Sequence, residues 1–307
     1  MATELISVVS PVHNEEEIIS DFIKRVRTSL EEFNWELLLV DDGSTDNTYE
    51  LIAKIAETDS RVKPIKLSRN FGHQPAISCG IDNATGDAVV IIDSDLQDPP
   101  EVIKEFIHKW KLGYEVVYGQ RRNRNGETFF KKFTAKWFYR ILNLFSETKI
   151  PVDTGDFRLM DRKVVEAIKS MQEKNRYLRG MVAWVGFNQI PVLYDREARN
   201  KGKTKFNLLK MLNFATDGVF SFSTKPLKIA NLMSLTFTLV AAGFASYVIY
   251  QKIFFPDRSL PGFVTTVLLI SVIAGLQFLV MGILGSYIGR IYKEIKDRPI
   301  YIINNKE

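Results

Sequence analysis

The sequence predicts an α/β protein in which a mostly parallel sheet carries helices on both faces, followed by an anchor of two membrane-spanning helices. Three observations predict this class. Short β-branched apolar runs alternate with amphipathic segments over residues 4–119, which is the rhythm of βαβ units. Acidic residues follow two of those runs, at 41–42 and 93–95, where open parallel sheets bind ligands. Two long stretches, 229–251 and 260–289, contain no charged residue.

The predicted strands and helices alternate along this first part of the chain. Continuous apolar runs bounded by turn residues indicate strands that are buried on both faces. Strands are predicted at residues 5–10, 36–40, 61–67, 87–92 and 115–118, of which 61–67 is the least apolar. Between them, apolar residues at helical spacing indicate amphipathic helices. The helices are predicted at 15–33, 48–57, 74–83 and 101–112, the last of them opened by Pro99 and Pro100.

The two uncharged stretches near the C-terminal end are long enough to cross a bilayer, since about 20 apolar residues span its core. We expect membrane helices at about 229–251 and 262–289, and the alternative is a pair of buried helices in a soluble protein. The connection between them is nearly neutral, whereas basic residues flank the pair at Lys225, Lys228, Arg290, Lys293, Lys296 and Arg298. This bias predicts a multi-pass protein of the cytoplasmic (inner) membrane with both termini in the cytoplasm.

The composition limits the remaining possibilities. A chain of 307 residues with a net charge of +5 has room for one α/β domain and an anchor. The single cysteine, Cys79, excludes an intrachain disulfide, and the histidines at 13, 73 and 108 lack zinc-like spacing. The N-terminus has no signal-peptide pattern. Basic and aromatic residues are interleaved, but the sequence has no RNA-binding motif, so we expect no nucleic-acid partner.

The acidic residues at the two strand ends are candidate ligand-binding groups. Asp93 and Asp95 can together hold one hard divalent cation, which can bridge to the phosphates of a nucleotide. Alternatively, they only cap the next helix. Asp41 and Asp42 can accept hydrogen bonds from a base or a ribose, or can simply form a tight turn. The sequence contains neither G-x-G-x-x-G nor a Walker lysine loop, which argues against a dinucleotide or P-loop site.

Five motifs in order carry a resemblance to a known family. They are residues 7–16, 40–46, 93–101, 153–159 and 199–205. The first three resemble family 2 inverting glycosyltransferases of the GT-A fold. The last two, including a match to R-x-x-G-x-[ST]-K, resemble the polyprenyl-phosphate (dolichol-phosphate-type) sugar synthases, and the two spans are similar to the bacterial polyprenyl-phosphate glucosyltransferase branch. The Q-x-x-R-W motif of processive synthases is missing, which argues against chain polymerisation.

The resemblance implies a UDP-sugar donor, most often UDP-glucose, and Mg²⁺ or Mn²⁺ as cofactor. It implies that Asp93 and Asp95 surround the metal on the diphosphate and that Gln97 contacts the same region. Asp156 is implied near the reaction centre, so the candidate catalytic residues are Asp156, Asp95 and Gln97. The residues implied to bind the nucleotide sugar are Pro11, Asn14, Glu15, Asp41, Asp42 and Asp93.

The implied acceptor is a polyprenyl phosphate, such as undecaprenyl phosphate, at the cytoplasmic face of the lipid bilayer. An acceptor that is already an anion needs no strong general base, but it needs cations, and arginine suits phosphate oxygens. Two basic clusters, at 119–140 and 196–210, provide them. The candidate phosphate ligands are Arg121, Arg122, Arg199, Lys203 and Lys205. The alternative role for these clusters is attraction to anionic lipid headgroups.

The predicted organisation has four parts. They are a cytoplasmic catalytic domain at 1–200, juxtamembrane amphipathic helices at 201–228, two membrane helices within 229–290 and a cytoplasmic tail at 291–307. Glycines at 282, 285 and 289 permit close helix contact, and the family precedent favours a homo-oligomer. Two other functions stay open: a glycosyltransferase with a hydroxyl acceptor, and a non-catalytic membrane adaptor that senses nucleotide sugars.

Overall fold

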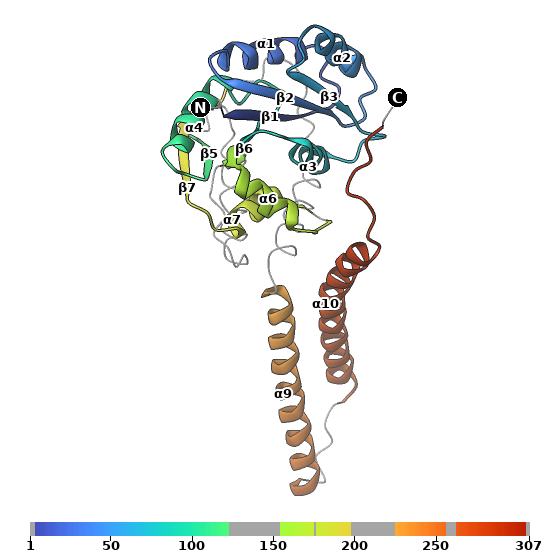
Figure 1. The fold of residues 1–307 in the computed structure, drawn as a ribbon. Coiled ribbons are helices and arrows are strands. Elements are labelled where there is room, and N and C mark those ends of the chain that lie inside the picture. The colour runs from blue at the N-terminus through green and yellow to red at the C-terminus, as the bar shows by residue number, and fades with distance from the viewer. Residues whose placement is uncertain (1–3, 123–153, 175, 198–224, 256–261, 305–307) are drawn as a thin grey trace.

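The computed structural model describes residues 4–122, 154–174, 176–197, 225–255 and 262–304. Within these residues, a sheet with helices on both faces lies at one end of two long helices (Figure 1). The juxtamembrane helices predicted at 201–228 fall almost entirely outside the described residues, as does most of the basic cluster at 119–140.

The described residues form one seven-stranded sheet with the order β3-β2-β1-β4-β6-β5-β7. The strands are β1 Leu5–Val12, β2 Asn34–Asp41, β3 Val62–Lys66, β4 Ala88–Ile91, β5 Val116–Arg121, β6 Thr154–Asp161 and β7 Gln189–Tyr194. Strand β6 runs antiparallel to its neighbours β4 and β5, whereas the other neighbouring strands pair in parallel. The predicted fold class, a mostly parallel sheet within an α/β architecture, is therefore confirmed.

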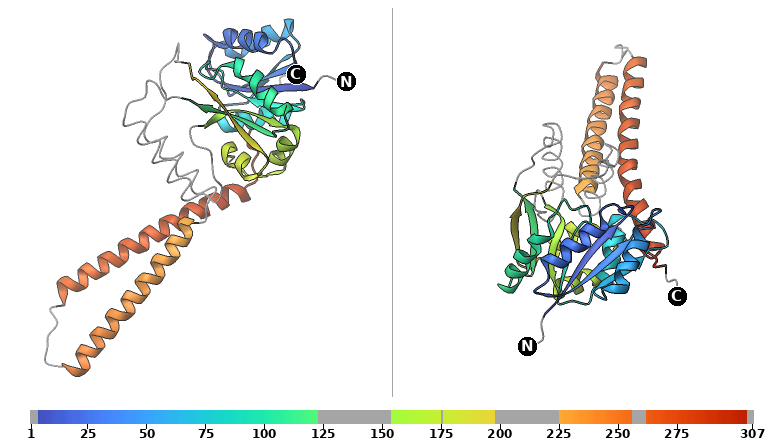
Figure 2. Two further views of the ribbon diagram at one scale, coloured as in Figure 1. Left: turned by 90° about the vertical axis from the view of Figure 1, so that its left-hand side faces the viewer. Right: turned by 90° about the horizontal axis from the view of Figure 1, so that it is seen from above.

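Helices cover both faces of this sheet (Figures 1 and 2). One face carries α1 (Ile19–Ser29), α2 (Thr48–Thr58), the short 3-10 helix η1 (Pro100–Val102) and α4 (Ile103–Lys111), and the other carries α3 (His73–Asn83), α6 (Arg162–Ser170) and α7 (Leu178–Trp184). Because successive strand residues point to opposite faces, Val8 lies in one core with Phe22 and Phe106, and its neighbour Val9 lies in the other with Ile77. The central strands contribute side chains to both cores. This packing on both faces holds the strand ends in place.

The strand register brings distant parts of the chain to one edge of the sheet. Strands β1, β2 and β4 are parallel, with Val12 opposite Asp41, so their carboxyl ends lie side by side. Strand β6 enters from the opposite direction, with Arg158 opposite Ile91. Extending that register by two residues sets Asp156 against Asp93, so the antiparallel strand delivers a third acidic segment to the same edge.

The first helix begins later than the sequence pattern predicts. We expected a helix over 15–33, but α1 begins at Ile19. Asn14 adopts a left-handed backbone conformation, with φ 54°, and the Glu15 amide donates a hydrogen bond to Thr48 Oγ1 at 2.9 Å. These contacts hold the segment after β1 against the start of α2, and Glu15 accepts hydrogen bonds from the amides of Ile18 and Ile19 in a turn that precedes α1. Glu15 consequently stays beside the strand ends.

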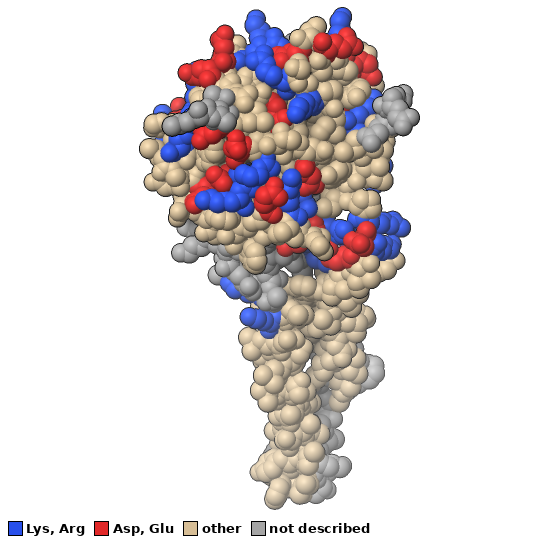
Figure 3. Space-filling model, in the orientation of Figure 1, with Lys and Arg blue, Asp and Glu red and all other residues tan. Residues whose placement is uncertain are grey.

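Two long helices extend away from the sheet, α9 (Lys225–Phe254) and α10 (Phe263–Ile295) (Figures 1 and 2). Their segments 227–251 and 272–295 are long and apolar enough to cross a membrane. Large apolar side chains point outward, and Leu232 and Phe278 are 64% and 71% exposed. Charged residues gather on the sheet domain and are sparse along the helices (Figure 3). Core helices of a soluble protein bury such side chains, so this pair fits a membrane hairpin instead.

The chain returns from α10 to the far edge of the sheet. Leu67, just after β3, forms an antiparallel bridge with Ile303, and the Tyr301 hydroxyl donates a hydrogen bond to Asp82 Oδ2 on α3 at 3.0 Å. Backbone hydrogen bonds join Ser68 N to Ile302 O at 2.9 Å and Asn304 N to Lys66 O at 2.7 Å. The tail thereby covers an otherwise open sheet edge and ties the end of the second long helix to the domain.

Removing the inward-facing side chains of this tail is expected to destabilise the domain. Tyr301 and Ile303 pack against a small core that includes Leu67 and Cys79. We expect the double variant Tyr301→Ala, Ile303→Ala to lose on the order of 2 kcal/mol from apolar contacts and the hydrogen bond. At about 2–4 °C per kcal/mol for a domain of this size, the melting temperature in detergent should fall by several degrees. The neighbouring Ile302→Ala, whose side chain is 51% exposed, is the control and should change it little. An equal fall in both variants would contradict the docked tail.

Candidate active site

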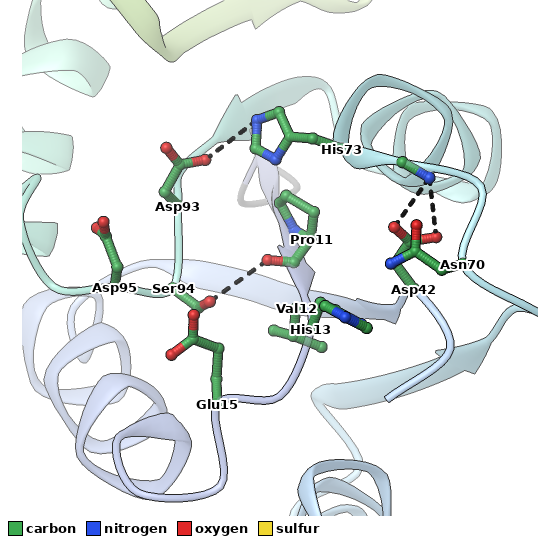
Figure 4. Close-up of a pocket in the computed structure, with 11 residues that line it drawn as sticks. Pro11, Val12, His13, Glu15, Asp42, Asn70, His73, Asp93, Ser94 and Asp95 are labelled. Atoms are coloured by element: carbon green, nitrogen blue, oxygen red, sulfur yellow. Dashed lines mark hydrogen bonds and ion pairs between the residues drawn. The ribbon is translucent and has the colours of Figure 1, made fainter. Parts of the chain in front are cut away.

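A pocket of about 350 Å³ opens at the edge where the three parallel strands end. Its lining comes from the end of β1 and from the segments that follow β1, β2, β3 and β4. The lining residues are Pro11, Val12, His13, Glu15, Asp42, Asn70, Gly72, His73, Asp93, Ser94 and Asp95. Figure 4 shows Asp93 and Asp95 on one side of this pocket and Asp42 and Asn70 on the other. The pocket therefore unites the first three sequence motifs, which lie far apart along the chain.

The segment after β1 forms the base of the pocket. The Asn14 side chain does not line it. Instead, Asn14 Oδ1 accepts a hydrogen bond from Thr45 N at 2.8 Å, and Asn14 N donates to Ser44 Oγ at 3.0 Å. Asn14 thus joins the loops after β1 and β2. Pro11 and Glu15 do line the pocket, so two of the three residues predicted from this motif can contact a ligand directly.

The two acids after β2 have different surroundings. Asp41 is fully buried, lies outside the lining, and accepts a hydrogen bond from Ser44 N at 3.2 Å. Burial raises the pKa of its carboxyl, against the hydrogen bonds from Ser44. Asp42 lines the pocket and accepts hydrogen bonds from the amides of Phe71 at 2.7 Å and Gly72 at 2.9 Å. Asp42 therefore holds the pocket wall that includes Gly72 in place. A contact of Asp41 or Asp42 with the base or the ribose stays a prediction.

A glycine between these loops permits their close approach. Gly43 has φ 67°, in the left-handed region that favours glycine. A Cβ added there would lie 2.5 Å from Asn70 N and 2.6 Å from the Arg69 carbonyl carbon. No larger residue fits without moving the wall that carries Asn70, which explains the glycine in the motif Asp41 to Asp46.

Asp93 and Asp95 face the pocket from the segment after β4. Burial raises the pKa of Asp93 to about 6, and the charges of Asp156, Asp98 and Asp95 act in the same direction, against that of His73. Asp95 Oδ1 accepts a hydrogen bond from Gln97 N at 3.1 Å, which closes a tight turn in which Leu96 has φ 56°. The turn aims two carboxylates into one pocket.

The surroundings of these two carboxylates fit a divalent cation. Asp93 Oδ1 is buried and has no hydrogen-bond donor; its nearest cationic atom is His73 Nε2, at 3.5 Å. No group of three or more metal-ligating side chains occurs within the described ranges. Mg²⁺ is commonly held by one or two carboxylates together with substrate phosphates and water. The donor set therefore suits a cation that is completed by a bound diphosphate.

Asp156 lies deep beside this pocket, on β6. It is 5% exposed, and Arg179 on α7 donates two hydrogen bonds to it, Nε to Oδ1 at 2.8 Å and Nη2 to Oδ2 at 3.0 Å. Burial raises the pKa of Asp156, but the charge of Arg179 and hydrogen bonds from His73 and Arg179 hold it well below its ordinary value. The carboxylate is therefore ionised, with both oxygens engaged by donors.

A family comparison decides what kind of protein carries this site. Residues 7–169 match the family model described as glycosyl transferase family 2. The chain belongs to this family. The match spans β1 to α6, so the pocket and all four of its lining segments lie inside it, and the predicted family membership is confirmed.

Curated relatives of this glycosyltransferase align over nearly its whole length. The uncharacterized glycosyltransferase YkcC of Bacillus subtilis is 48% identical, covering 97% of this chain and 92% of the relative. The prophage bactoprenol glucosyl transferase homolog of Escherichia coli is 43% identical, covering 97% and 98%. The bactoprenol glucosyl transferase of Shigella phage SfV is 42% identical, covering 98% and 99%. The two long helices are thus part of what these relatives share with the glycosyltransferase.

Of the predicted acceptor-phosphate ligands, Arg121 and Arg122 are described, and they differ. Arg121 ends β5 beside the strand that carries Asp156: a Cβ added at Gly155 would lie 3.4 Å from Arg121 Nη2. Its Nε is buried without a hydrogen-bond partner. Burial lowers the pKa of Arg121, but the charge of Asp98, together with the charge of Tyr194 and a hydrogen bond between Arg121 and Tyr194, raises the pKa overall. Arg122 points outward, 3.6 Å from Asp195. Arg199, Lys203 and Lys205 lie outside the described residues.

Three residues of the site were not singled out by the sequence motifs as functional. Gln97, by contrast, was singled out by its motif, but it lies outside the pocket lining and contacts the turn through its backbone. The three residues are Gln74, Arg179 and His73, which all contact Asp156. Arg179 lies on α7, a helix of seven residues that is too short to give a clear periodic signal. A cation that pairs with a buried acid across the fold cannot be found from spacing alone.

Proposed function

We propose that this glycosyltransferase transfers a single glucose, with inversion, from UDP-glucose to the phosphate of a polyprenol such as undecaprenol. The observation that carries the proposal is the identity of 42–43%, over 97–98% of this chain, with proteins named as bactoprenol glucosyl transferases. The pocket formed by the strand ends supports the donor half of this reaction, and Arg121 supports the acceptor half.

The donor half places the nucleotide sugar in the pocket. Asp93 and Asp95 would hold Mg²⁺ or Mn²⁺, and the buried Oδ1 of Asp93, which accepts no hydrogen bond, is the observation that favours this. When bound, the metal supplies charge neutralisation of the UDP leaving group. Pro11 at the end of β1, Glu15 just after this strand, and Asp42 and Asn70 opposite would position the nucleotide. Positioning and electrostatic stabilisation together account for most of the expected rate.

The acceptor half is an attack by a phosphate oxygen on the opposite face of the sugar. A phosphate is ionised near neutral pH, so no residue has to remove a proton from it. Asp156, a buried acid that His73 links to Asp93, has both oxygens bound by Arg179 and is thus poorly placed to act as a base. This favours a phosphate acceptor over a hydroxyl acceptor. Arg121, whose Nε lacks a partner, would contact the acceptor phosphate, with Arg199, Lys203 and Lys205 from the next motif.

The membrane half of the proposal concerns where the reaction takes place. The two long helices would anchor the enzyme in the cytoplasmic membrane, with the catalytic domain and both termini on the cytoplasmic side. The basic residues that flank the hairpin support this orientation. Because α10 leads directly to the tail that is fixed on β3 and α3, the anchor holds the domain near the headgroups where the acceptor phosphate lies. We further propose that the enzyme assembles as a homo-oligomer through the glycine-containing helix.

Chelation tests the metal part of this proposal. Treating the purified enzyme with EDTA should abolish formation of the glucosyl lipid, because two carboxylates alone would repel the diphosphate. Adding Mg²⁺ or Mn²⁺ in excess should restore it, while the same concentration of Na⁺ should not. The measurement is the transfer of labelled glucose to undecaprenyl phosphate in detergent. Full activity in EDTA would show that Asp93 and Asp95 have another role.

A further inference from the structure

The buried carboxylate of Asp156, on β6, is held by three side chains from two helices, α3 and α7. Arg179 on α7 grips it with two hydrogen bonds. Gln74 Nε2, in the first turn of α3, lies 3.3 Å from Oδ2, and His73 Nε2 lies 3.5 Å from the same oxygen. The same His73 nitrogen is 3.5 Å from Asp93 Oδ1. Asp156 is therefore linked through His73 to one of the two proposed metal ligands.

Gln74 also connects Asp156 to the backbone of α7. Its Oε1 accepts a hydrogen bond from Leu178 N at 3.1 Å, so its side-chain amide joins the start of α7 to Asp156. That contact fixes the position of Arg179, the next residue along α7. The Arg179 side chain is only 20% exposed and the Asp156 side chain 4%, so solvent screens their attraction weakly. Strand β6, helix α3 and helix α7 thus converge on one carboxylate.

The carboxylates that line the pocket explain why Asp156 is paired with Arg179 beside it. The pocket lining contains four carboxylates, Glu15, Asp42, Asp93 and Asp95, and its described cationic candidates are the imidazoles of His13 and His73. A further unpaired carboxylate at Asp156 would repel the diphosphate of the donor. Arg179 neutralises that charge from the side away from the lining. Asp156 can then orient His73, which does line the pocket.

We propose that Arg179 is a positioning residue that locks Asp156, and that Asp156 in turn holds His73 over the donor pocket beside Asp93. In this assignment, which rests on the proposed function, Asp156 serves catalysis through its neighbours Arg179 and His73 and takes no proton. Without Arg179, the carboxylate turns and His73 loses its fixed place. A displacement of about 1 Å in a catalytic arrangement can cost about 100-fold in rate, so the loss should fall on kcat more than on donor binding.

A double-mutant cycle tests this lock. We expect Arg179→Ala and Asp156→Ala each to lower kcat by about 10- to 100-fold, with KM for UDP-glucose changing less than about threefold. The variant carrying both should be no slower than Asp156→Ala alone, because residues that act as one unit are non-additive. Arg179→Lys, which keeps the charge but not the two-pronged contact, should recover part of the rate. Multiplied losses in the double variant, or a rise in KM with unchanged kcat, would overturn the proposal.

The chain offers a matched control for this cycle. Arg61 grips Asp59 with the same two-pronged geometry, at 2.8 and 2.9 Å, far from the pocket on the segment before β3. Arg61→Ala should leave kcat unchanged, and melting temperatures should show that all variants are folded. If Arg179→Ala does not fold, Arg179→Lys and His73→Gln replace it: in the His73→Gln background, Asp156→Ala should cost little more, and a full further loss would contradict the lock. Absence of glucosyl lipid with the wild-type enzyme would instead refute the proposed function.

Discussion

Replacing Asp95 by alanine is expected to lower the rate of glucosyl transfer by about 100- to 1,000-fold, the size of loss found when one electrostatic stabiliser of a transition state is removed. Asp95 lines the pocket and comes from the tight turn closed by Gln97 N. Replacing Asp95 tests the proposed metal site more directly than replacing Asp93. Asp93 also faces His73, so its replacement would disturb the metal site and the histidine together.

The measurement is the initial rate of lipid-linked glucose formation at saturating Mg²⁺, beside the melting temperature. Asp95→Asn keeps the volume of the side chain and should lose nearly as much activity as Asp95→Ala. Asp21 lies exposed on α1, away from the pocket, so Asp21→Ala should behave as wild type. A folded Asp95→Ala enzyme that retains a third or more of the wild-type rate would show that this carboxylate does not hold the metal.

Replacing Arg121 by alanine is expected to impair use of the lipid acceptor while leaving donor binding intact. Its Nε is buried and unpartnered, and its guanidinium approaches Gly155 on the strand of Asp156. A charge-assisted hydrogen bond contributes about 1.5–3 kcal/mol, so kcat/KM for the polyprenyl phosphate should fall by about 10- to 100-fold. The affinity for UDP-glucose, measured by calorimetry, should change less than about threefold.

Removing a positive charge elsewhere on the domain should not reproduce the effect of Arg121→Ala. Lys54 is exposed on α2, and Lys54→Ala removes the same charge from the other side of the domain without affecting acceptor use. Arg121→Lys should recover only part of the activity, because lysine lacks the planar donors of arginine. Equal weakening of UDP-glucose and lipid binding in Arg121→Ala would mean that Arg121 supports the fold near Asp98 instead of the acceptor.

The first half of the sheet could be predicted because its signals are local. Each of the five expected strands overlaps an observed strand by at least half of the observed strand's length. The start of α1 could not be predicted from the sequence. It depends on the left-handed backbone of Asn14 and on a contact with Thr48, which lies beyond the next strand. The direction of β6 was not predicted either: an antiparallel pairing of residues far apart in sequence leaves no mark on hydrophobic periodicity.

The candidate site shows the same division. The motifs around Asp42 and Asp93 could be placed together from the rule that parallel strands end at one edge, and the pocket confirms that they meet. Neither the burial of Asp41 nor its hydrogen bond to Ser44 can be read from the motif. Arg179 and the docking of Tyr301 on α3 depend on tertiary packing, and only the folded chain reveals them.

The most direct test of the central claim is to offer the purified enzyme UDP-glucose labelled in the sugar, together with either undecaprenyl phosphate or undecaprenol. The account predicts labelled glucosyl phosphate lipid from the phosphate acceptor only, one UDP released per lipid formed, and an inverted anomeric configuration by NMR. Transfer to undecaprenol at a comparable rate, or a retained configuration, would contradict an inverting transferase that relies on an anionic acceptor.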